Sequence, residues 1–118
     1  MSDKIDWATI GWEVYTGATP SSGVSQVVED HCMINRKLKL FSVHFDVRFT
    51  NGAPNTLFSG MPEPFNTSKY LPAWYVGGTK DRECATCWLR TSGGTLACGT
   101  TTQAEATGIQ ITGMYPLK

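Results

Sequence analysis

Charged side chains are scarce in this chain of 118 residues. They make up 17% of it, and ten basic residues balance ten acidic ones. A chain without net charge has no field that attracts nucleic acid or anionic lipid by bulk electrostatics. Apolar runs of membrane-spanning length are also lacking. We therefore expect no nucleic-acid partner and no membrane insertion.

Targeting signals and catalytic motifs are missing as well. Residues 1–6 have neither the apolar core of a secretion signal nor the Arg-rich pattern of a transit peptide, so we expect synthesis in a cytosol. No serine elbow, phosphate-cradling glycine loop or H-E-x-x-H occurs. His44 and Asp46 could form an acid–base pair, but polar residues often alternate on a strand without catalysing anything. We predict a protein that is not an enzyme and requires no metal or cofactor.

Good helix candidates are rare, and strand patterns take their place. The clearest periodicity lies within residues 37–50, where five apolar side chains occupy every second position: Phe41, Val43, Phe45, Val47 and Phe49. This pattern predicts a long strand with one buried face. Residues 51–55 then combine Asn-Gly with a proline, which predicts a turn.

Shorter extended segments are spread along the rest of the chain. Twelve glycines and six prolines separate them, and residues 92–94 form the tight loop of a predicted hairpin. Residues 24–34 are ambiguous between a strand and a helical turn. The other expected strands are 7–16, 56–61, 71–76, 84–91, 95–100 and 108–117. These features predict a single all-β domain over residues 1–118, an antiparallel β-sandwich or barrel that is jelly-roll-like.

A candidate ligand site lies on the polar side of the long strand. His44, Asp46 and Arg48 project from one face because strand side chains alternate. An imidazole, a carboxylate and a guanidinium within about 7 Å of one another could orient sugar hydroxyls, which both donate and accept hydrogen bonds. The alternative is a solvated outer face or a polar subunit interface.

Tryptophan is frequent for a chain of this length. Trp7, Trp12, Trp74 and Trp88 each combine a large contact area with a polar indole N–H. Each could serve as an exposed platform for a ligand or as bulky packing in the core or an interface. Trp74 and Trp88 lie nearest to predicted loops, so they are the preferred ligand-binding candidates.

The four cysteines leave several interpretations open. Cys84 and Cys87 have a C-x-x-C spacing, but the chain lacks the second pair of a zinc site and the helix that follows a redox pair. In a strand these two would lie about 10 Å apart, beyond disulfide reach. Cys87 faces Cys98 only if the hairpin turns at Ser92-Gly93. The remaining interpretation is buried free thiols, as expected for Cys32 too.

Several features together carry a resemblance to a known family. They are the long strand 40–50, the Leu71-Pro72 step, the glycine hairpin 91–95, and the ending 111–117, whose Gly-Met-Tyr-Pro is similar to the G-T-Y-P close of that family. From Met33 onward the chain resembles the C-terminal head domains of phage tail receptor-binding proteins, particularly those of lactococcal siphophages.

The resemblance implies a trimeric β-sandwich or barrel at the tail tip of a virion, made in the host cytoplasm. Residues 31–118 would form the head-like core and residues 1–30 a neck or extra strands. The head would bind a host cell-surface saccharide and contact other tail or baseplate proteins.

The family holds its sugar with His, Asp, Arg and Trp side chains. His44-x-Asp46 is similar to its H-x-D pattern, although there the pattern precedes the glycine hairpin, where this chain has Cys87-Trp88-Leu89. The predicted ligand-binding residues are His44, Asp46, Arg48, Trp74 and Trp88. The alternative function is a structural or protein-binding β module of a virion, without glycan binding.

Overall fold

The computed structural model describes residues 10–65, 68–90 and 94–118, and all regular structure in these ranges is β-strand. No part of these ranges is a helix that could cross a membrane. The strands are β1 Trp12–Val14, β2 Thr19–Pro20, β3 Val24–Asp30, β4 Met33–Asn35, β5 Leu40–Phe49, β6 Thr56–Ser59, β7 Ser68–Val76, β8 Cys84–Arg90, β9 Thr95–Cys98 and β10 Gly108–Pro116. The all-β prediction is confirmed.

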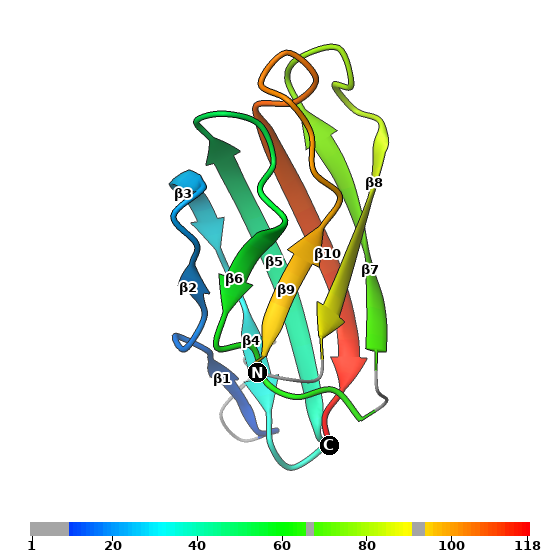
Figure 1. Cartoon of the computed structure of the whole chain (residues 1–118). Coiled ribbons are helices and arrows are strands. Elements are labelled where there is room, and N and C mark those ends of the chain that lie inside the picture. The colour runs from blue at the N-terminus through cyan, green and yellow to red at the C-terminus, as the bar shows by residue number, and fades with distance from the viewer. Residues whose placement is uncertain (1–9, 66–67, 91–93) are drawn as a thin grey trace, which may run out of the picture.

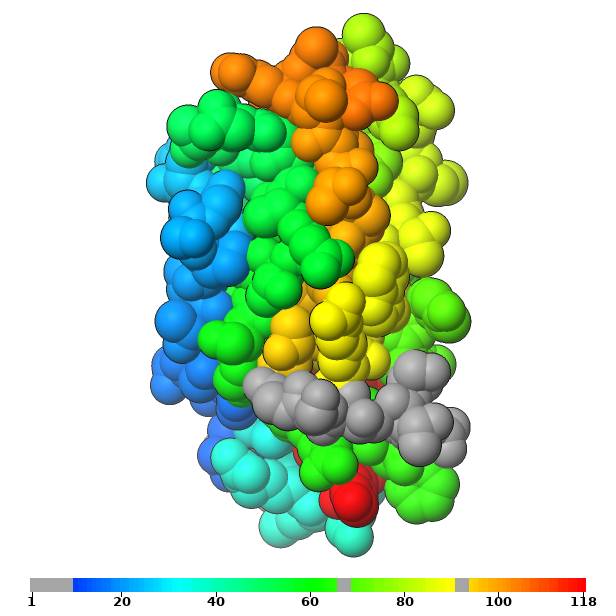
Figure 2. Space-filling view, in the orientation of Figure 1, coloured from blue at the N-terminus to red at the C-terminus, as the bar shows by residue number. Residues whose placement is uncertain are grey.

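The strands form one antiparallel sheet that curls over on itself. Its order is β1-β4-β5-β10-β7-β8-β9-β6-β2, and β3 also pairs with β5. Figure 1 shows β6 and β9 lying across β5 and β10, which gives the molecule the two layers of a sandwich. In the space-filling view the N-terminal segment, coloured blue, runs along one side of the molecule, where β2 pairs with β6 (Figure 2).

The core lies between these two layers. All five apolar side chains of the alternating β5 pattern are buried there, as predicted. The Phe45 ring of β5 stacks on the Phe58 ring of β6 at a centroid distance of 3.9 Å, which joins the layers directly. From β10, Ile109, Ile111 and Tyr115 point into the same core. The alternation that buries these side chains turns the polar side of β5 away from the core.

The predicted segments and the observed strands differ in detail. The ambiguous segment 24–34 contains β3 and the start of β4, which pair with different parts of β5. β7 begins at Ser68, so Pro72 lies inside the strand and does not open it. Pro72 has no N–H to donate, and the ladder between β7 and β10 ends at its neighbour Ala73 while pairing with β8 continues.

The described residues before position 31, 10–30, contribute strands to the same sheet. β1 pairs with β4, β2 with β6 and β3 with β5. The predicted turn after β5 is also present, with Gly52 at φ +85°. A Cβ at Gly52 would lie 2.1 Å from the Thr101 carbonyl oxygen, so both the conformation and the close approach require glycine.

Candidate functional site

The candidate site lies on the outer face, by which we mean the side turned away from the core in the layer β1-β4-β5-β10-β7. Here β5 and β10 are register partners, and three outward rows follow one another along them. Asp46 lies opposite Gln110, His44 opposite Thr112, and Ser42 opposite Met114. Successive rows are about 7 Å apart because every second residue of a strand shares a face.

A hydrogen-bonded network crosses three strands in the first of these rows. The Arg48 guanidinium pairs with one carboxylate oxygen of Asp46, and the Gln110 amide nitrogen donates to the other at 3.1 Å. The Trp74 indole N–H donates to the Gln110 amide oxygen at 2.8 Å. The network therefore links β5, β10 and β7, and it holds the Trp74 indole by its nitrogen.

The members of the network differ in their exposure to solvent. Asp46 is 8% exposed, and both of its oxygens accept bonds within the network. Arg48 keeps 31% of its side chain exposed, and Trp74 is 36% exposed. Only one terminal nitrogen of the Arg48 guanidinium is bonded to other described residues. A ligand on this face would therefore meet Arg48 and Trp74, with Asp46 behind them.

His44 occupies the next row and pairs with the neighbouring strand. Its Nε2 lies 2.7 Å from Glu29 Oε2 of β3, and the His31 ring is 5.7 Å from the His44 ring. The side chains of His44 and Glu29 are both nearly half exposed. An exposed pair of this kind contributes about 0–1 kcal/mol. His44 is therefore free to exchange Glu29 for a ligand at little cost.

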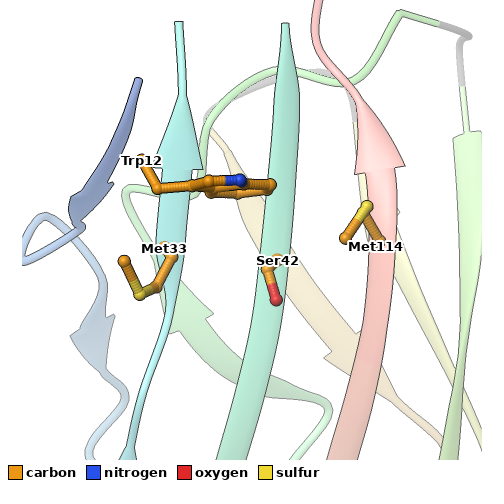
Figure 3. Close-up of a pocket in the computed structure, with 4 residues that line it drawn as sticks. All are labelled: Trp12, Met33, Ser42 and Met114. Atoms are coloured by element: carbon orange, nitrogen blue, oxygen red, sulfur yellow. The ribbon is translucent and has the colours of Figure 1, made fainter. Parts of the chain in front are cut away.

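A pocket of about 250 Å³ completes the outer face, in the third row. Its lining consists of Trp12 from β1, Met33 from β4, Ser42 from β5 and Met114 from β10. Figure 3 shows the Trp12 ring lying across β4 and β5, with Met33 and Met114 on either side of Ser42. The lining offers one hydroxyl group in otherwise apolar surroundings.

Of the predicted site residues, four share the outer face and one lies apart. Asp46, Arg48 and Trp74 belong to one network, and His44 lies beside it. Trp88 of β8 is the partner of Tyr70, whereas Trp74 is the partner of Cys84. Cys84 and Trp88 are four positions apart on β8, about 13 Å. Trp7 lies outside the described residues.

The cysteines do not form a site on the outer face. Cys84 is exposed and Cys87 is buried, because an odd spacing in a strand turns two side chains to opposite faces. Cys87 and Cys98 are register partners, the arrangement expected for a hairpin that turns at Ser92-Gly93, and all four cysteines are free. The hydrogen bond to the Cys98 sulfur and burial raise the pKa of Cys87. Burial also raises the pKa of Cys32, to about 12.

Sequence reasoning missed the residues that complete the outer face. Gln110 connects Asp46 to Trp74, yet its only signal was its place between Ile109 and Ile111, which marks it as outward-facing. The four pocket residues come from four segments of the chain, and no spacing in the sequence connects them. Comparisons with protein-family models, with curated proteins and with solved structures found no match.

Proposed function

We propose that this chain is a saccharide-binding module without catalytic activity, whose ligand lies on the outer face. The observation that carries the proposal is the network that presents Arg48 and the Trp74 indole, both partly exposed, beside His44. The setting that fits this activity is the receptor-binding head of a phage tail, which recognises a saccharide on the host surface.

The chemistry of the exposed groups suits a sugar. The unbonded donors of Arg48 can bind the oxygens of sugar hydroxyls, and the His44 imidazole can accept or donate according to its tautomer. The apolar face of a pyranose packs on an indole, and the bond to Gln110 keeps the Trp74 ring in place before the ligand arrives. Groups held in advance lose less entropy when they bind.

In this proposal Asp46 positions other groups and does not contact the sugar. Its carboxylate orients the Arg48 guanidinium and the Gln110 amide, and little of it is open to solvent. The same bonds argue for the absence of catalysis, because a carboxylate with both oxygens engaged is poorly placed to transfer a proton to a substrate.

A second candidate is a structural β module that binds another virion protein. It is favoured by exposed apolar side chains on the same layer, since Val14 is 70% and Met114 is 50% exposed. These residues could pack against another chain, including a second copy in a homotrimer. Light scattering at micromolar concentration tests the trimer, and a stable monomer counts against the phage-head setting.

A glycan array and host-cell adsorption test the proposed function. Arg48→Ala, Trp74→Ala and His44→Ala each remove a group that would contact the sugar, and each should reduce binding at least tenfold. Trp88→Ala is the matched control, because it removes an indole that lies outside the network. Undiminished glycan binding by all three site variants would refute the site, and no binding of any glycan by the unmodified protein would refute the function.

A further inference from the structure

The pocket in the third row lies outside the network and has a different chemistry. It adjoins the His44–Thr112 row, since Ser42 and Met114 are the next outward residues along β5 and β10. The Asp46–Gln110 row lies four residues away on each strand, about 13 Å. One ligand that reached both places would be longer than a single sugar ring and would run parallel to β5 and β10.

Buried polar contacts hold the backbone that leads into Trp12, the aromatic residue of this pocket. Asn35 of β4, the register partner of Trp12 in β1, is fully buried. Its amide nitrogen donates to the Ile10 carbonyl at 2.9 Å, and its amide oxygen accepts from the Leu38 N–H at 2.9 Å. Both ends of the amide are therefore used, and they fix the backbone that leads into Trp12.

Gly11 makes this anchoring possible. It has φ +95°, and a Cβ at this position would lie 2.8 Å from the Asn35 amide oxygen. A residue with a side chain would therefore strain the backbone and push β1 away from Asn35. This glycine and the buried asparagine set the backbone path from which the Trp12 side chain leaves, before any ligand binds.

The lining indicates the group that the pocket accepts. A volume of about 250 Å³ lies below the range of roughly 300–1,000 Å³ that holds a drug-sized molecule, so the pocket takes a part of a ligand. The Trp12 ring and the thioethers of Met33 and Met114 favour an apolar group. The Ser42 hydroxyl can donate one hydrogen bond or accept one. An acetamido group matches this lining, because its methyl is apolar and its amide can form a hydrogen bond with the Ser42 hydroxyl.

We infer that the pocket is a subsite for the acetamido group of an N-acetylated sugar within an oligosaccharide that lies along β5 and β10. The acetyl methyl packs between the Trp12 ring and the two thioethers, and the amide pairs with Ser42. The adjoining sugars extend past His44 toward Arg48 and Trp74. This inference rests on the proposed function and adds to it the ligand's substituent, direction and minimum length.

The test uses pairs of glycans that differ only at carbon 2 of their sugar units, which carries an acetamido group in one glycan and a hydroxyl group in the other. Oligomers of β-1,4-linked N-acetylglucosamine and of β-1,4-linked glucose are such a pair, and an array carries the galactose equivalents. We expect the unmodified protein to bind an acetamido glycan at least tenfold more tightly than its hydroxyl counterpart. Affinity should rise from the monosaccharide to the trisaccharide, as measured by calorimetry.

The variants separate this subsite from the rest of the outer face. Trp12→Ala and Met114→Ala should remove the acetamido preference, and Gly11→Ala should weaken it although this change deletes no contacting atom. Trp88→Ala is the matched control and should keep the preference. Circular dichroism confirms that each variant is folded.

Three outcomes would overturn the inference while the proposed function stands. They are glycan binding without an acetamido preference, a monosaccharide that binds as tightly as the trisaccharide, and a preference that survives Trp12→Ala. Failure to bind any glycan has a different meaning, because it refutes the proposed function itself.

Discussion

The substitution Gln110→Met tests the network that holds the outer face together. Methionine has nearly the volume of glutamine but cannot make either hydrogen bond, so packing against β5 and β7 is conserved. The change removes the donor to Asp46, a carboxylate that is 8% exposed, and the acceptor for the Trp74 N–H. A hydrogen bond to a charged group is worth about 1.5–3 kcal/mol.

The two lost bonds should not cost the same. The Trp74 N–H belongs to a side chain that is 36% exposed, so water can replace Gln110 there. Water reaches Asp46 less easily, and its remaining partner is Arg48. We therefore expect Gln110→Met to lower the free energy of unfolding by about 1.5–3 kcal/mol, nearly all of it from the bond to Asp46. The urea midpoint should fall while the m-value stays constant.

A control and a double-mutant cycle make this result interpretable. Thr112→Val lies on the same strand and face, is equally conservative in volume, and removes a hydroxyl that makes no side-chain hydrogen bond to the described residues. It should change stability by less than about 0.5 kcal/mol. In a cycle of Gln110→Met with Asp46→Asn, the coupling energy should be at least about 0.5 kcal/mol. A loss no larger than that of Thr112→Val, or an additive cycle, would refute the network as a stabilising feature.

Three further predictions concern the core and the turns. Of the four cysteines, Cys84 is exposed, so the native protein should react with one equivalent of a thiol reagent and the denatured protein with four. Stability should fall between pH 9 and about 12, because the Cys32 thiol ionises near 9 when unfolded but its pKa in the native protein is about 12; a flat profile of urea midpoint against pH would contradict this. Gly52→Ala should cost at least about 2 kcal/mol, from a positive φ and contact with the Thr101 carbonyl. A Cβ at Gly99 would make only an ordinary van der Waals contact, 3.8 Å from the Tyr75 hydroxyl, so Gly99→Ala should melt like the unmodified protein.

The sequence was most informative where a single strand contains the whole signal. The alternation in residues 41–49 predicted both the buried side of β5 and the outward position of His44, Asp46 and Arg48. The turn at residues 51–55 followed from the conformational demands of glycine and proline. In both cases the information is local, because the pleat of one strand decides which side chains share a face.

The partners of that strand could not be derived in the same way. β10 is more than fifty residues away from β5 along the chain, and the alternating pattern does not say which strand lies beside which. The sequence therefore does not link Gln110 with Asp46, and it does not distinguish Trp12 from the other three tryptophans as part of a pocket. The short β1, with three residues, has too little pattern to predict that it pairs with β4 beside Asn35. These contacts depend on the strand order of the curled sheet.

Once the strand order is set, the site and the core obey the same constraint. A shift of one residue between β5 and β10 would turn Ile109 and Ile111 outward and place Gln110 in the core without a partner for its amide. The register that keeps the isoleucines buried is thus the register that brings Gln110 to Asp46 and Met114 to Ser42. The outer face needs no separate stabilisation to hold its rows in place. Substitutions on it can therefore change what the protein binds while the buried isoleucines keep the strands aligned.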